Sequence, residues 1–166
     1  MNQTIRVLLV DDHSPFRDFL RTSLEQIPKL EVVGEALDGD EAIQKVRELS
    51  PDLILLDIGL PKLDGLEVAR QIQKFSAHSI ILIVSCTCDW DLIEHAFLSG
   101  ARGYLVKYDA EKELISAVET VRRGSQYISA TGVRRILKEY RHGGPSRMLN
   151  RISSAIAREA AGEPGD

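Results

Sequence analysis

The stretch 53-LILLDIGLPKLDG-65 joins a strand signal to a helix start, with an acid between them. Leu53 to Leu56 form a short run of branched apolar residues, which is typical of a fully buried strand in a parallel sheet. Asp57 follows this run directly, and Asp64-Gly65 opens a helix further along the chain. Because ligands bind just beyond the carboxyl ends of the strands in an open parallel sheet, Asp57 is predicted to lie at a binding edge.

Three other apolar runs end in polar residues in the same way. The runs at 7–10, 80–84 and 104–106 are followed by Asp11-Asp12, by Ser85 and by Lys107. All of these polar side chains are therefore predicted to project at one edge of the sheet. Three neighbouring carboxylates repel one another, and Mg²⁺ prefers such hard oxygen ligands, so Mg²⁺ is the expected cofactor. A lysine and a hydroxyl beside metal-bound carboxylates suit a phosphoryl group.

Strand and helix signals alternate along residues 4–124. Ser14 is predicted to cap the first helix, with Pro15 at its first position, and Asp38 is predicted to cap the second. Strands that alternate with helices of about 10–15 residues imply a parallel sheet covered on both faces. The predicted fold class is therefore α/β, with a doubly wound five-stranded parallel sheet of the flavodoxin-like type.

Length and charge indicate one folded domain with an appendage. The chain has 166 residues, of which 43% are hydrophobic, as in ordinary globular proteins. Residues 1–123 carry 14 Lys and Arg against 21 Asp and Glu, whereas residues 124–166 carry 7 against 4. The domain is predicted to span residues 1–124, and residues 125–166 are predicted to form a basic, linker-like helical tail.

Several classes of protein are excluded by composition. No apolar stretch approaches the roughly 18 residues of a membrane span, and the N-terminus reaches Asp11 too soon for a signal peptide. We therefore expect a cytoplasmic protein with no membrane contact. Cys86 and Cys88 lack the clustered partners of a zinc site and are expected to be plain free thiols. Trp90 is expected to be an exposed aromatic, either in contact with a partner or packed on its own helix.

The segment after Gly124 no longer alternates between strand and helix. Tyr127-Ile128 is a short extended piece, and a helix is predicted from apolar residues spaced i, i+3, i+4, i+7. These residues are Val133, Ile136, Leu137 and Tyr140. Gly143-Gly144-Pro145 is expected to end that helix, and residues 149–156 to form a weak last one. The basic residues here fit either a solvated helix face or contact with a phosphate backbone, but weak aromatic content argues against specific DNA binding.

Residues 5–124 resemble the receiver domain of two-component response regulators. Asp57-Ile58-Gly59-Leu60-Pro61-Lys62-Leu63-Asp64-Gly65 fits the family pattern D-x-x-[LM]-P-x-[LM]-D-G. The acid pair, the hydroxyl residue and Gly103-Tyr104-Leu105-Val106-Lys107 follow at the spacing of that family. The segments at 30–36 and 100–104 are similar to the NarL/FixJ branch in particular. That branch normally continues into a helix-turn-helix, for which no entry motif is recognisable here.

The resemblance implies a role for each residue at the sheet edge. Asp57 would accept a phosphoryl group from a phosphohistidine on a partner histidine kinase. Asp12, Asp57 and the backbone carbonyl of Gly59 would ligate Mg²⁺, with Asp11 helping directly or through water. Ser85 and Lys107 would each bind a phosphoryl oxygen after transfer. Tyr104 would be the switch aromatic, which turns inward as Ser85 moves.

Three functions of different classes remain open at this point. The first is a phosphoacceptor signalling module that acts through protein contacts, with homodimerisation left open. The second is a NarL/FixJ-type DNA-binding transcription regulator whose output part is lost or shortened, which would require residues 130–160 to form a compact helix-turn-helix. The third is a Mg²⁺-dependent phosphohydrolase, which would need an acid two residues after its nucleophile. That position is Gly59, so the chain is not expected to be an enzyme.

Overall fold

The structure of the chain is a computed structural model that describes residues 3–142, so the predicted helix end at 143–145 and the weak helix at 149–156 lie outside the described residues. The strands are β1 (Ile5–Val10), β2 (Leu30–Ala36), β3 (Leu53–Leu56), β4 (Ile80–Ser85), β5 (Gly103–Val106) and β6 (Tyr127–Ile128). The helices are α1 (Ser14–Leu24), α2 (Gly39–Leu49), α3 (Gly65–Phe75), α4 (Trp90–Leu98), α5 (Ala110–Arg122) and α6 (Ala130–Arg141), and the 3-10 turn η1 (Lys107–Asp109) precedes α5.

The strands form one parallel sheet in the order β2-β1-β3-β4-β5-β6. The predicted doubly wound parallel sheet is confirmed for β1 to β5. The prediction of only five strands is wrong, because Tyr127 and Ile128 pair with Gly103 and Tyr104 as a sixth strand. The sheet therefore continues past the boundary predicted at Gly124. A strand of two residues is too short for a periodic signal, so only its pairing identifies it.

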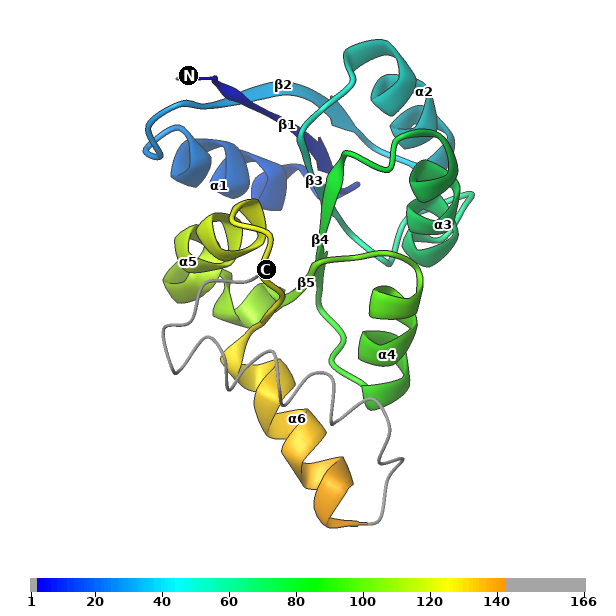
Figure 1. Cartoon of the computed structure of the whole chain (residues 1–166), viewed down its shortest axis with the longest axis vertical. Helices are drawn as coiled ribbons and strands as arrows, with labels where there is room; N and C mark the ends of the chain where they lie inside the picture. The colour runs from blue at the N-terminus through cyan, green and yellow to red at the C-terminus, as the bar shows by residue number, and fades with distance from the viewer. Residues whose placement is uncertain (1–2, 143–166) are drawn as a thin grey trace.

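The sheet is covered on both faces (Figure 1), with α1 and α5 on one side and α2, α3 and α4 on the other. Alternate residues of β1 serve the two faces: Leu8 and Val10 pack with the α2–α4 layer, whereas Val7 and Leu9 pack with α1 and α5. All four side chains are buried. This is why strands of such sheets read as continuous apolar runs.

The helix starts follow the predicted capping chemistry in part. Asp38 caps α2, because its carboxylate accepts a hydrogen bond of 2.9 Å from the backbone N–H of Glu41. The prediction that Ser14 caps α1 is wrong, since His13 occupies the N-cap position and Ser14 is the first helical residue. The helix begins one residue early because the His13 carbonyl already accepts the N–H groups of Phe16 and Arg17. Pro15 is therefore at the second helical position and not at the first, as was predicted for it, but it stays within the first turn, where proline is tolerated.

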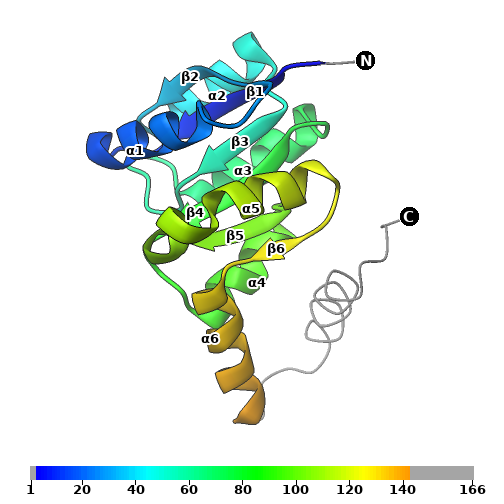
Figure 2. The ribbon, with the colours of Figure 1, turned by 90° about the vertical axis from the view of Figure 1, so that its left-hand side faces the viewer.

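The predicted helix in the tail is confirmed as α6, which projects from one end of the body (Figure 2). Its apolar stripe is only partly covered: Ile136 is 3% exposed, whereas Leu137 and Tyr140 are 51% and 57% exposed. Gly132 lies close to Ile128, where an added Cβ would meet the isoleucine Cγ2 at 2.6 Å. The first half of α6 thus docks on its own domain, and its second half leaves the stripe open.

The expectation of an exposed Trp90 is wrong. Its side chain is 7% exposed and packs in the core layer formed with α2, α3 and α4. α6 packs against α4, and Arg135 of α6 forms an ion pair with Asp89, the N-cap residue just before Trp90. Among the helices described for residues 3–142, none is long and apolar enough to cross a membrane.

Candidate functional site

Four adjacent strand ends build the site at one edge of the sheet. Asp11 and Asp12 follow β1, Asp57 follows β3, Ser85 ends β4 and Lys107 follows β5. β1, β3, β4 and β5 are neighbours in the sheet. A cavity of ≈ 640 Å³ opens here, and Asp12, Asp57, Gly59, Ser85 and Lys107 line it. The structure therefore brings together the residues that the sequence places at this edge.

The three carboxylates form a cluster that could hold a metal ion. One oxygen from each of Asp11, Asp12 and Asp57 lies within 4.8 Å of the others. Asp11 is 1% exposed and Asp57 8% exposed, whereas Asp12 is exposed. Burial of like charges at this spacing is unfavourable without a cation, because the low dielectric strengthens their repulsion. An all-oxygen set of three carboxylates that opens to solvent suits a hard divalent cation with several retained waters.

Lys107 partly offsets the charge of these acids. Its Nζ lies 2.5 Å from Asp11 Oδ2 and 3.1 Å from Asp57 Oδ2, and it also sits over the Phe16 ring at 4.6 Å from the centroid. Burial lowers the pKa of Lys107, but its hydrogen bond to Asp11 and the charge of Asp57 outweigh burial, so the pKa lies above its ordinary value. The lysine is therefore a fixed cation between two acids.

The loop after β3 holds Asp57 in place. Its Oδ1 accepts a hydrogen bond of 3.0 Å from the Gly59 N–H, and its own N–H donates to the Val10 carbonyl at 2.9 Å. At Gly65 an added Cβ would lie 2.2 Å from the Asp57 carbonyl oxygen, so only glycine lets α3 start this close to the acid. Asp64 caps α3 through the N–H groups of Leu66 and Glu67. The motif at 57–65 thus folds back on its own first residue.

Ser85 and Tyr104 are joined through one intermediate residue. Ser85 Oγ lies 3.0 Å from Thr87 Oγ1, and Tyr104 donates its hydroxyl hydrogen to the Thr87 carbonyl at 2.6 Å. Tyr104 is 0% exposed, and burial raises the pKa of its hydroxyl. The aromatic ring therefore occupies its inward position, against the segment that Ser85 begins. The switch role of the pair stays a prediction.

Two contributors to the site are not apparent from the strand-end pattern. Phe16 lines the cavity and contacts Lys107, although its helical spacing reads only as an apolar face. Arg17 donates from Nη1 to the Asp11 carbonyl at 2.8 Å. An arginine six residues after an acid carries no periodic signal, so only the fold reveals this contact. Gly59 lines the cavity as expected, and metal ligation by its carbonyl stays a prediction.

Comparison with known proteins agrees with this geometry. Residues 7–119 match the model of the response regulator receiver domain. The chain is 35% identical to the transcriptional regulatory protein DegU of Brevibacillus brevis over 137 residues, which are 82% of this chain and 58% of that protein. It is 34% identical to the transcriptional regulatory protein LiaR of Bacillus subtilis over 144 residues, 87% of this chain and 68% of that one. The chain therefore spans little more than half of the first of these relatives.

Solved structures extend the same comparison to the fold. A LuxR-family two-component response regulator from Aurantimonas sp. SI85-9A1 superimposes with a TM-score of 0.79 at 34% identity, over 83% of this chain and 99% of that one. The receiver domain of the putative response regulator NarL from Mycobacterium tuberculosis gives a TM-score of 0.69 at 31% identity, over 74% and 98% of the two chains. The chain therefore belongs to the response regulator receiver domain family, with relatives in its LuxR/NarL branch.

Proposed function

We propose that this domain accepts a phosphoryl group on Asp57 from the phosphohistidine of a sensor histidine kinase, in a Mg²⁺-dependent reaction. The observation that carries the proposal is the placement of Lys107 between Asp57 and Asp11, beside an exposed third acid in an open cavity. A carboxylate that lines an open cavity next to a fixed cation is a nucleophile with charge stabilisation already in place.

The transfer needs little covalent chemistry from the protein. An Asp57 carboxylate oxygen forms the new P–O bond while the P–N bond to the histidine breaks, and the bonding pair stays with the imidazole nitrogen. Gly59 N–H orients one Asp57 oxygen, and Lys107 faces the other, where negative charge on the transferring oxygens needs a cation. Ser85 lies on the neighbouring strand end, from which its hydroxyl would bind a phosphoryl oxygen after transfer.

The residues present fit Mg²⁺. Asp11, Asp12 and Asp57 supply only hard oxygens, and the exposed Asp12 leaves room for retained water. When bound, Mg²⁺ would neutralise negative charge on the phosphoryl oxygens. The Gly59 carbonyl is the proposed fourth protein ligand, because this residue lines the cavity next to Asp57. His13 is a poor ligand for this ion and serves α1 through its backbone instead.

Signal output would follow from a change at Ser85 and Tyr104. The phosphoryl group supplies a differential interaction with Ser85 and Lys107, and an equilibrium shifts only by such a difference. The backbone carbonyl of Tyr104 accepts a hydrogen bond from the Ser129 N–H. Ser129 lies between β6 and α6 in the chain. A shift of the tyrosine strand would therefore reach α6, which we infer to be the output element.

We infer a signalling module and no phosphohydrolase, because Gly59 stands where such an enzyme would need an acid. Two relatives are named as transcriptional regulators, which suggests gene control as the regulated process. Within residues 3–142, however, α6 is the single helix that follows the sheet, and one helix cannot form a helix-turn-helix. Specific DNA binding by this chain is therefore not proposed. The free thiols of Cys86 and Cys88 accord with a cytoplasmic location.

The proposal is tested by the site of phosphorylation. The protein is incubated with acetyl phosphate and Mg²⁺, and its intact mass is recorded. One phosphoryl adduct is expected in the wild type and in Asp40→Asn, which alters an exposed acid of α2 outside the cavity. Asp57→Asn is expected to carry no adduct, because the amide is not a nucleophile. An adduct of normal yield in Asp57→Asn would refute the assignment.

A further inference from the structure

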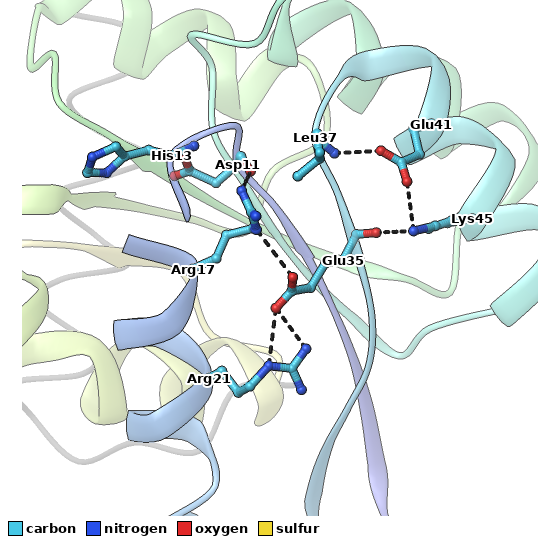
Figure 3. A network of polar contacts seen from close by, with 8 residues as sticks. All are labelled: Asp11, His13, Arg17, Arg21, Glu35, Leu37, Glu41 and Lys45. Atoms are coloured by element: carbon cyan, nitrogen blue, oxygen red, sulfur yellow. Dashed lines mark hydrogen bonds and ion pairs between the residues drawn. The ribbon is translucent and has the colours of Figure 1, made fainter. Parts of the chain in front are cut away.

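Glu35, near the end of β2, binds two arginines of α1 beside the acid pair (Figure 3). Its Oε1 accepts hydrogen bonds from Arg21 Nη2 at 2.7 Å and Nε at 3.1 Å, and its Oε2 accepts one from Arg17 Nε at 3.3 Å. Burial raises the pKa of Glu35, but the hydrogen bonds of Arg21 and Arg17 outweigh burial and keep the pKa below its ordinary value. The glutamate is therefore a charged anchor for both arginines.

The Glu35 anchor is itself braced from the opposite side. Lys45 of α2 donates to the Glu35 carbonyl and forms an ion pair of 2.7 Å with Glu41. Glu41 in turn accepts a hydrogen bond of 2.8 Å from the Leu37 N–H. Figure 3 shows this chain of contacts running from the end of β2 into α2. Glu35 is thus tied at its side chain to α1 and at its backbone to α2.

Of the two arginines, only Arg17 connects Glu35 to the acid pair of the site. The same guanidinium that binds Glu35 donates from Nη1 to the Asp11 carbonyl at 2.8 Å, and the Arg17 side chain is only 11% exposed. Arg21 is bound to Glu35 but, within residues 3–142, makes no hydrogen bond to Asp11. The two arginines therefore share Glu35 as a partner, but of the two only Arg17 touches the backbone of the acid pair.

The contact with Asp11 bears directly on Asp12. The Asp11 carbonyl belongs to the peptide plane that starts Asp12, so holding that oxygen sets the direction in which Asp12 leaves the strand end. The Asp11 side chain is held separately, by Lys107 and by the His13 N–H at 2.8 Å. The Asp12 carboxylate has no hydrogen bond to any other described residue, so the backbone is what places it.

We propose that Arg17 is a positioning residue for the Mg²⁺ site, which braces the Asp11–Asp12 peptide against Glu35 so that the Asp12 carboxylate faces Asp57. This inference rests on the proposed function, because it assigns Arg17 a part in the metal site of the phosphorylation reaction. Arg17 touches no reacting atom and acts through the acid pair. Outer contacts that orient metal ligands typically change metal affinity by about 10–100-fold when they are removed.

Charge alone predicts the opposite sign. Removing a cation near a cluster of carboxylates makes the local potential more negative and would strengthen Mg²⁺ binding. Loss of positioning would weaken Mg²⁺ binding instead, because the exposed Asp12 would sample orientations that point away from the cluster. The direction of change in the Mg²⁺ Kd therefore separates a bracing role from a merely electrostatic one.

The experiment measures the Kd for Mg²⁺ alone by calorimetry in the wild type, Arg17→Met and Arg21→Met. Each variant loses one positive charge and its contacts with Glu35, whereas only Arg17→Met also loses the bond to the Asp11 carbonyl. Arg17→Met is expected to weaken Mg²⁺ binding by about tenfold or more, and Arg21→Met by less than about threefold. Melting temperatures without metal establish that each variant is folded.

A milder variant covers the case in which Arg17→Met does not fold. Arg17→Lys keeps the charge but replaces a fork that serves two acceptors by a single nitrogen, so its Mg²⁺ affinity is expected between those of the wild type and Arg17→Met. Equal or tighter Mg²⁺ binding in both Arg17 variants would overturn the bracing role and leave phosphorylation of Asp57 intact. Absence of Mg²⁺ binding in the wild type would overturn the proposed function as well.

Discussion

Lys107 makes the acid cluster tolerable in the absence of metal. Its side chain is 12% exposed, and those of Asp11 and Asp57 are 2% and 10% exposed. Removing one partner of a mostly buried ion pair costs more than the pair contributes, because the remaining charge stays desolvated. Lys107 and a bound divalent cation would therefore both offset the negative charge of Asp11 and Asp57.

We expect Lys107→Met to lower the free energy of unfolding by about 3 kcal/mol without Mg²⁺, since two desolvated carboxylates lose their cation. Mg²⁺ is expected to restore a larger share of stability to this variant than to the wild type. Urea unfolding with and without Mg²⁺ measures both effects. Lys112→Met, on the exposed side of α5, is the control. A loss no greater than that of the control would contradict the role of Lys107.

At the scale of elements, α6 is held by acids that belong to the preceding turn and helix. Asp109 accepts hydrogen bonds from the Thr131 N–H at 2.9 Å and the Thr131 hydroxyl at 2.8 Å, and Glu113 accepts the Ala130 N–H at 3.1 Å. These N–H groups lie in the first turn of α6 and have no partners within the helix. Asp109 lies two residues after Lys107, so the attachment of α6 begins next to the site.

The pKa of Asp109 makes this attachment dependent on pH. Burial raises the pKa, but hydrogen bonds from Ser129 and Thr131 outweigh burial, so the pKa lies below the usual 3.8. A lowered carboxyl pKa gives stability that is present above 3.8 and is lost as pH falls through the folded-state pKa. We expect Asp109→Asn to cost about 1 kcal/mol at pH 7, with a smaller difference from the wild type at lower pH. Urea unfolding across pH 3–7 measures this, and a constant difference would contradict it.

The output role of α6 has its own test. Beryllofluoride, a phosphoryl mimic, is expected to change amide exchange at residues 90–110 and 130–141 together, because β5, β6 and η1 connect Lys107 and Tyr104 to α6. Mass spectrometry of peptides from both states reports the protection. Asp57→Asn treated in the same way is the control. Identical protection in the two states would refute the proposed switch, although Asp57 could still be phosphorylated.

At the scale of the molecule, the site and α6 are attached to different strands of the same sheet. The residues at the carboxyl ends of β1, β3, β4 and β5 line the cavity. β6 at the sheet margin leads into the projecting α6 (Figure 2). Binding at the cavity therefore acts on the stability of the whole domain, because the acid cluster exists only when those strands are assembled.

We expect Mg²⁺ at about 100 times its Kd to add about 2.7 kcal/mol to the free energy of unfolding of the wild type. Asp12→Ala is expected to lose most of this gain, because it removes a hard oxygen ligand. Asp40→Ala, on α2, should keep it. Thermal unfolding with and without Mg²⁺ provides the measurement. An equal rise in melting temperature for Asp12→Ala and the wild type would exclude Asp12 as a ligand.

The sequence by itself determined the parts that depend on local pattern. Apolar runs of strand length, each followed by Asp57, Ser85 or Lys107, predict the sheet and the edge where these residues meet, because parallel strands carry their ends to the same side. The stripe from Val133 to Tyr140 likewise predicts α6 from its period.

Only the tertiary structure decided the contacts between distant segments. Three features of this kind are the pairing of β6, the burial of Trp90 and the hydrogen bond from the first turn of α6 to Asp109. Each depends on residues that are far apart in the chain or on a segment too short to show a periodic pattern. Arg17 reaches Glu35 and Asp11 because α1 crosses beside both β1 and β2. A periodic pattern states which face of an element is apolar, whereas the partner that this face or end meets depends on how the elements pack.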